Sequence, residues 1–131
     1  MRLTFTLICA AALAAATPTL AAPKAAAGKS CFKPQDIGSH TVGNDHTLYL
    51  NVGGKTVWRA SMRNICLAGI QSSDPIQISG HGEGGSVCEA GDLDVRATLA
   101  GGGGLATHCV VDSVSKLTPA ETAALPAGVK P

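Results

Sequence analysis

Four widely spaced cysteines constrain this chain more than any other feature of its sequence. The two closest of them, Cys88 and Cys109, are 21 positions apart, and Cys66 and Cys88 are 22 apart, so the short Cys-x2–4-Cys clip of structural zinc sites is missing. Apart from Cys9 near the start, these four are all the cysteines of the sequence, and an even number of them in an exported chain predicts two disulfide bonds with three possible connectivities. We favour Cys66–Cys88, which closes a loop in the middle of the chain, together with Cys31–Cys109, which links the first ordered strand to the last.

The start of the chain indicates export. Met1 and Arg2 form a short positive start, residues 3–16 carry no charge, and the small residues Ala21 and Ala22 close the segment. These are the three parts of a secretory signal peptide, which predicts a signal peptide over residues 1–21, cleaved near Ala21 with Ala22 as the alternative site. The apolar run is shorter than the ~20 residues of a membrane span. We therefore expect a small soluble domain in the periplasm or secreted, with no membrane span in the mature chain.

The charge balance limits the classes of partner. Loss of residues 1–21 removes Arg2 and the fifth cysteine, Cys9, and leaves nine basic residues against nine acidic ones. Nucleic-acid-binding domains usually carry a basic excess, so we expect no nucleic-acid partner. A net charge of zero also gives no steering toward anionic lipid or acidic polymers. The partner we expect is a protein of the cell envelope.

The rest of the chain divides into a flexible leader (22–30), a single β domain (31–125) and a disordered tail (126–131). Within the domain, short β-rich runs alternate with glycine-rich or polar turns, a pattern typical of small sandwiches and barrels. We therefore predict an all-β fold: a small disulfide-stapled barrel or sandwich of about six short strands with a short C-terminal helix.

The clearest hairpin is predicted over residues 47–62, where a Gly-Gly pair separates two β-rich runs. A two-residue turn at these glycines would pair Leu50 with Val57 and Tyr49 with Trp58. This register places the two aromatic residues together on one face. We interpret them as core residues, with an exposed recognition pair as the alternative.

Three further elements follow from local patterns. Residues 75–79 predict a short strand, and the alternation of apolar and polar residues over 93–99 predicts a half-buried strand. The natural partner of this second strand is the β-rich segment 105–114. Thr118 and Glu121 form a capping box around a proline, which predicts the start of the C-terminal helix.

Metal binding and catalysis are the two alternatives to a role in binding a protein of the cell envelope. The candidate metal ligands are His40, His46 and His81, with surface histidines in polar loops as the simpler interpretation. A metal held by His81 would bind weakly, because its glycine-rich loop loses entropy on ordering. We assign no cofactor and no catalytic residue, since the chain has no Gly-x-Ser-x-Gly elbow and no Cys-x-x-Cys motif.

Several short boxes together resemble an uncharacterised family of small exported proteins of Gram-negative bacteria, a domain of unknown function with a four-cysteine pattern. Beyond the cysteines, the boxes are Phe32, Ile37, Asp45-x-Thr47-Leu48-Tyr49-Leu50, Trp58-Arg59, Gly91-Asp92-Leu93 and Leu117-Thr118-Pro119-x-Glu121. The resemblance covers about residues 31–125 and implies no activity or cofactor. His46 and Trp58 depart from it, standing where an Arg-like and a Tyr-like residue are expected, and the glycine-rich loops 80–85 and 101–104 look specific to this chain.

Three hypotheses follow from the sequence. The first is an exported, non-catalytic binding or structural module of the periplasm. The second is a weak metal-binding protein that uses the loop histidines. The third, with the least support, is a small enzyme of unidentified class, which would need a concave pocket with convergent titratable groups.

Overall fold

The computed structural model describes residues 29–99 and 104–131 of the chain. The predicted signal peptide, its cleavage site near Ala21 and most of the leader 22–30 lie outside the described residues. Among the helices that are described, none has the length and hydropathy of a membrane-spanning segment.

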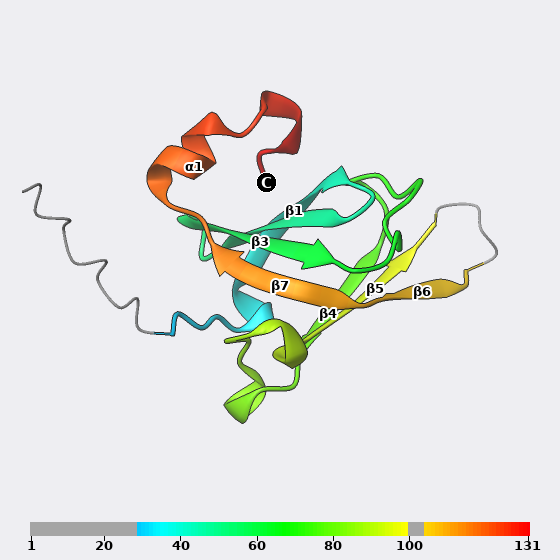
Figure 1. Cartoon of the computed structure of the whole chain (residues 1–131), viewed down its shortest axis with the longest axis horizontal. Helices are drawn as coiled ribbons and strands as arrows, with labels where there is room; N and C mark the ends of the chain where they lie inside the picture. Colours follow the sequence, from blue (N-terminus) through cyan, green and yellow to red (C-terminus); the bar gives the residue numbers. More distant parts are fainter. Residues whose placement is uncertain (1–28, 100–103) are drawn as a thin grey trace, which may run out of the picture.

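Seven strands form two antiparallel sheets (Figure 1). The four-stranded sheet has the order β1-β2-β3-β7, and its strands are β1 (Ile37–Asn44), β2 (Thr47–Val52), β3 (Thr56–Met62) and β7 (Val111–Lys116). The three-stranded sheet has the order β4-β5-β6, and its strands are β4 (Ile76–Gly80), β5 (Leu93–Thr98) and β6 (Ala106–Cys109). The helices are α1 (Pro119–Ala124) and the 3-10 turns η1 (Pro34–Asp36), η2 (Glu83–Gly85), η3 (Ala90–Asp92) and η4 (Ala127–Val129).

The fold is therefore mostly β, as the sequence indicates, with two differences. The described strands form two open sheets and no closed barrel, so the barrel alternative is wrong. Because the chain also contains α1 and several 3-10 turns, it is not strictly all-β.

The hairpin of β2 and β3 is confirmed, but its predicted register is wrong by one residue. The turn includes Lys55 as a third residue, and the two glycines before it have φ of +63° and +69°, a conformation that side chains disfavour. Val52 therefore pairs with Thr56 rather than facing Lys55. The two glycines therefore locate the turn but do not fix its length.

The corrected register changes which side chains share a face. Trp58 pairs with Leu50, and both are buried in the core, whereas Tyr49 pairs with Arg59 and is half-buried. Because neighbouring residues of a strand alternate between faces, a slip of one residue reverses every side chain. The two aromatic residues consequently lie on opposite faces of the sheet.

The predicted strand 105–114 is divided between the two sheets. Its first part, β6, pairs with β5 as expected, but its second part, β7, pairs with β3 instead. Val110 marks the crossing: its amide donates to Asn64 Oδ1 at 2.8 Å, and its carbonyl accepts from the Arg63 amide at 2.7 Å. The loop after β3 thus fixes the point where the chain changes sheet.

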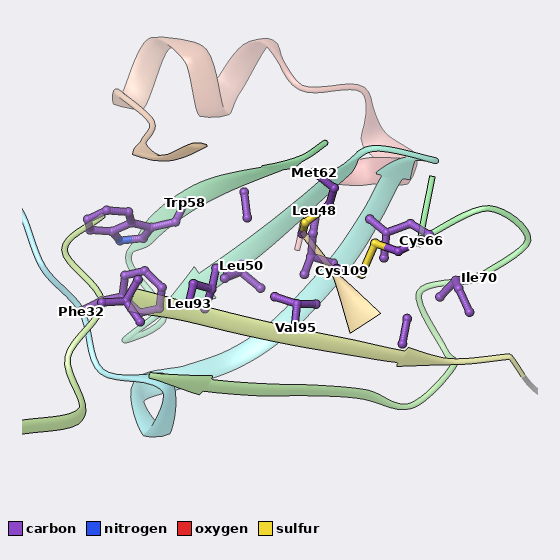
Figure 2. Close-up of a cluster of buried hydrophobic side chains, with 14 of the residues drawn as sticks. Phe32, Leu48, Leu50, Trp58, Met62, Cys66, Ile70, Leu93, Val95 and Cys109 are labelled. Carbon is purple, nitrogen blue, oxygen red and sulfur yellow. A yellow bond between two sulfur atoms is a disulfide. The ribbon is translucent and has the colours of Figure 1, made fainter. Parts of the chain in front are cut away.

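The hydrophobic core lies between the two sheets, and residues from both contribute to it (Figure 2). The four-stranded sheet supplies Leu48, Leu50, Trp58, Ala60 and Met62, and the three-stranded sheet supplies Leu93, Val95, Ala97 and Cys109. Sheet-on-sheet packing of this kind buries the inner face of each sheet.

The four cysteines of the described residues all form disulfides, but the connectivity we favoured is wrong. The bonds are Cys31–Cys88 and Cys66–Cys109, the second of which joins the core in Figure 2. Phe32 and Val87 explain the first bond, because their two reciprocal backbone hydrogen bonds of 3.0 and 2.7 Å set Cys31 beside Cys88. For the second bond, the side chain of Asn64 contacts the backbone of His108 and of Val110, on either side of Cys109, and so brings Cys66 beside Cys109.

The C-terminal segment lies against the four-stranded sheet, on the side away from the three-stranded sheet (Figures 1 and 2). The predicted capping box is confirmed: Glu121 N donates to Thr118 Oγ1 at 3.2 Å, and Thr118 N donates to Glu121 Oε2 at 2.7 Å. These contacts with the Thr118 backbone and hydroxyl hold the pKa of Glu121 below its usual range. The segment 126–131, predicted to be a disordered tail, contains η4, and the Pro131 carbonyl accepts from Asn51 Nδ2 at 3.4 Å.

Candidate functional site

The outer face of the three-stranded sheet carries a cluster of charged side chains. The apolar residues of β5 point into the core, so Asp94 and Arg96 between them face outward. Arg96 pairs across the sheet with His108 of β6, and Asp94 pairs with Ser79 of β4. His81 follows directly after β4. We call Asp94, Arg96, His81 and His108 the Asp94 cluster.

Asp94 lies at the centre of this cluster, with only 15% of its side chain exposed. Its Oδ2 accepts a hydrogen bond from Arg96 Nε at 3.3 Å and lies 3.9 Å from His81 Nε2. His108 Nε2 lies 2.8 Å from Oδ1, within hydrogen-bond distance of the carboxylate.

The environment of Asp94 keeps its carboxyl ionised. Burial raises the pKa of Asp94, but the positive charge of Arg96 and the nearby His108 together outweigh this effect, so the pKa is lowered from its ordinary value. The carboxylate is thus a fixed negative charge around neutral pH. Its three basic neighbours keep between 55% and 63% of their side chains exposed, so they remain accessible to a ligand.

The lowered pKa predicts a particular dependence of stability on pH. Because the carboxyl of Asp94 titrates at lower pH in the folded chain, its stabilising effect is present above the unfolded pKa and is lost as the pH falls through the folded value. We expect Asp94→Asn to be less stable than the unchanged protein at pH 7, with a difference in stability that shrinks as the pH falls and the carboxyl of Asp94 takes up its proton. Urea midpoints measured from pH 7 into the acid range test this, and a difference independent of pH would contradict it.

Two open hollows flank the cluster. One has a volume of about 390 Å³ and extends from His108 and Arg96 to the crossing at Val110. The other, of about 350 Å³, lies toward β4 and includes Ser79. His81, Asp94 and Arg96 line both hollows. Because Cys109 in the first hollow is held in a disulfide, it offers no thiol, and the arrangement suits the binding of a polar group better than nucleophilic attack.

The three predicted metal ligands have different surroundings. His40 on β1 lines a separate hollow with Ile76 and Ile78, and His46 Nδ1 lies 3.2 Å from the Met62 carbonyl oxygen. Only His81 belongs to the Asp94 cluster. Across residues 29–99 and 104–131, no group of three His, Cys, Asp or Glu side chains is arranged to hold a metal ion.

Sequence reasoning missed three of the four members of the cluster: Asp94, Arg96 and His108. A signal was present, because Asp94 and Arg96 are the outward positions of the alternating strand at 93–99. The missing information was the register between β5 and β6, which brings His108 opposite Arg96.

Comparisons with known proteins find no match to this chain among family models, curated proteins or solved structures. The resemblance to an exported four-cysteine family therefore stays a prediction, and the functional argument depends on the geometry of the chain itself.

Proposed function

We propose that this chain is an exported, non-catalytic binding module that contacts an acidic group of an envelope protein through the Asp94 cluster. The observation that carries the proposal is the difference in exposure between Asp94 and its three basic neighbours. A mostly buried, ionised Asp94 holds three basic side chains in place, and each of those side chains keeps more than half of its surface exposed.

The chemistry of Arg96 favours an acidic ligand. Its contact with Asp94 uses Nε, and the hydrogen bonds among the described residues involve neither of its terminal guanidinium nitrogens. Those two nitrogens match the two oxygens of a carboxylate. His81 and His108 stand on either side, and their exposed imidazole rings can donate hydrogen bonds to the same acidic group.

The covalent structure supports a location outside the cytosol. Two disulfides fit an oxidising compartment such as the periplasm or the extracellular space. The predicted signal peptide over residues 1–21 and the resemblance to small exported proteins support the same location. A disulfide-stapled domain with a fixed charged face is also what a binding or structural module requires.

Capture from envelope extracts tests the proposal. The oxidised protein without residues 1–21 is immobilised beside two variants: Arg96→Gln/His108→Gln, and the control Arg63→Gln. Arg63 is a matched control because it is also an exposed arginine paired with a carboxylate, 3.1 Å from Asp112 Oδ1. We expect one saturable partner to be retained by the unchanged protein and by the control, and to be lost by the double variant.

Two outcomes would overturn the proposal. The first is capture that is equal for all three forms, which would place the contact elsewhere. The second is turnover of a substrate that disappears in Asp94→Asn, which would make the cluster a catalytic site. Circular dichroism of each variant confirms that it is folded, so that loss of capture reports on the contact.

The weak metal-binding alternative makes a separate prediction. Because His40, His46 and His81 have different neighbours and no described group of three ligands is arranged around a metal, we expect no heat when zinc is titrated into the oxidised protein at high micromolar concentration. Calorimetry measures this directly. Saturable zinc binding that is lost in His81→Ala/His108→Ala would contradict the prediction and favour the metal-binding alternative.

A further inference from the structure

Another hollow lies on the face of the four-stranded sheet away from the Asp94 cluster, between the C-terminal segment and that sheet (Figure 1). Its volume is about 490 Å³, and its lining comes from the start of β3, the end of β7, α1 and the residues that follow η4. This volume is within the range of ~300–1,000 Å³ that is usual for small-molecule sites. We call it the C-terminal hollow.

The lining of the C-terminal hollow is apolar and well fixed. Val57 and Leu117 keep only 7% and 6% of their surface exposed, and the Leu117 amide donates to the Val57 carbonyl at 2.8 Å. Pro119 and Ala123 of α1 also line it, and because they are four positions apart on a helix they lie on one face. The capping box at Thr118 holds the start of this helix in place.

Three lysines from three different segments surround this apolar lining: Lys55 of the β2–β3 turn, Lys116 of β7 and Lys130 near the C-terminus. All three are exposed. The described parts of the chain contain every Asp and Glu of the sequence, and in them no side-chain carboxylate lies within ion-pair distance of these lysines. Glu121, the acidic residue of α1, is bonded to Thr118.

We propose that the C-terminal hollow binds a small amphiphilic carboxylate, an unbranched fatty acid of medium chain length. The alkyl chain lies against Val57, Leu117 and Ala123, and the carboxylate is held by the surrounding ammonium groups. Charge complementarity selects this occupant, because the apolar hollow is surrounded by three unpaired lysine ammonium groups. A neutral molecule of the same shape would leave these ammonium groups without a partner. The site does not depend on the Asp94 cluster, so either proposal can fail alone.

Titration of decanoate, below the concentration at which it forms micelles, tests this site in the oxidised protein without residues 1–21. We expect saturable binding of one decanoate per chain, with amide chemical-shift changes centred on Leu117 and Ala123. The affinity should rise about fourfold for each methylene between hexanoate and decanoate, because each buried CH₂ adds a similar increment of transfer free energy. An alkyl glucoside of the same chain length should bind at least tenfold more weakly, because it lacks the charge.

Variants separate the contribution of the lysines from that of the apolar lining. Lys55→Gln/Lys116→Gln/Lys130→Gln should remove the preference for decanoate over the neutral glucoside. The matched control Lys29→Gln, a lysine that pairs with Glu89 at 3.5 Å, should leave the affinity unchanged. Ala123→Phe should block both ligands by filling the hollow. Arg96→Gln should have no effect, since Arg96 belongs to the other site.

Three results would overturn the proposal. One is the absence of saturable binding by decanoate while the amide spectrum shows a folded protein. Another is equal binding of decanoate and the glucoside, which would leave the lysines without a role. The third is binding of a short acidic peptide, with the same dependence on the three lysines, in place of decanoate.

Discussion

A Cys66→Ser/Cys109→Ser variant is expected to lose about 4 kcal/mol of unfolding free energy, because the bond between these cysteines closes a loop with a sequence separation of 43. The bridge restricts the unfolded chain, and a domain of this size has a net stability of only ~5–10 kcal/mol. The variant should therefore be close to unfolded at 37 °C. Urea unfolding followed by the fluorescence of Trp58, the single tryptophan, measures the loss.

The Cys31→Ser/Cys88→Ser variant serves as the comparison. Its loop has a sequence separation of 57, so the chain-entropy model predicts a similar loss of ~4 kcal/mol. The Cys66–Cys109 pair is the more deeply buried of the two, with 6% and 1% of each residue exposed, so serine there leaves a polar hydroxyl in the core and should cost more. An unfolding free energy within 1 kcal/mol of the unchanged protein would contradict the prediction.

Peptide mapping under non-reducing conditions tests the connectivity itself. Trypsin leaves Cys66 and Cys88 in one peptide, because no lysine or arginine lies between them. Cleavage at Asp74 separates the two cysteines, and the structure then predicts a linked pair containing Cys66 and Cys109. A linked pair containing Cys66 and Cys88 would support the connectivity favoured from the sequence.

Local patterns in the sequence were sufficient to locate most elements, because the signals that define them are themselves local. The capping box around Pro119 and the alternation at 93–99 each involve neighbours in sequence, and both elements are present. The glycine turn before β3 also lies where predicted. Its length was not fixed by the glycines, and the inclusion of Lys55 changed the register of the whole hairpin.

Long-range pairings could not be predicted, since nothing local encodes them. The disulfide connectivity depends on the bridge between Phe32 and Val87, which joins segments far apart in the chain. The division at Val110 depends on the loop that contains Asn64. The candidate site has the same origin, because Asp94 and His108 meet only through the pairing of β5 with β6.

The second large effect is expected for Trp58→Ala, which should lower the free energy of unfolding by about 3–5 kcal/mol. Trp58 is 4% exposed, its ring centroid lies 4.8 Å from that of Phe32, and it pairs with Leu50 across the hairpin (Figure 2). Removal of the indole leaves a cavity that the two sheets cannot close without moving. Urea unfolding followed by far-UV circular dichroism measures the loss, because the variant has no tryptophan.

Tyr49→Ala separates the observed register from the predicted one. In the structure Tyr49 lies on the opposite face from Trp58, half-buried, with its ring against Gly43. Tyr49→Ala should therefore lower the unfolding free energy by less than half as much as Trp58→Ala. The predicted register would place both rings on one face and make the two losses similar. Losses below 1 kcal/mol for Trp58→Ala would instead favour an exposed recognition pair, since surface side chains contribute little to folding stability.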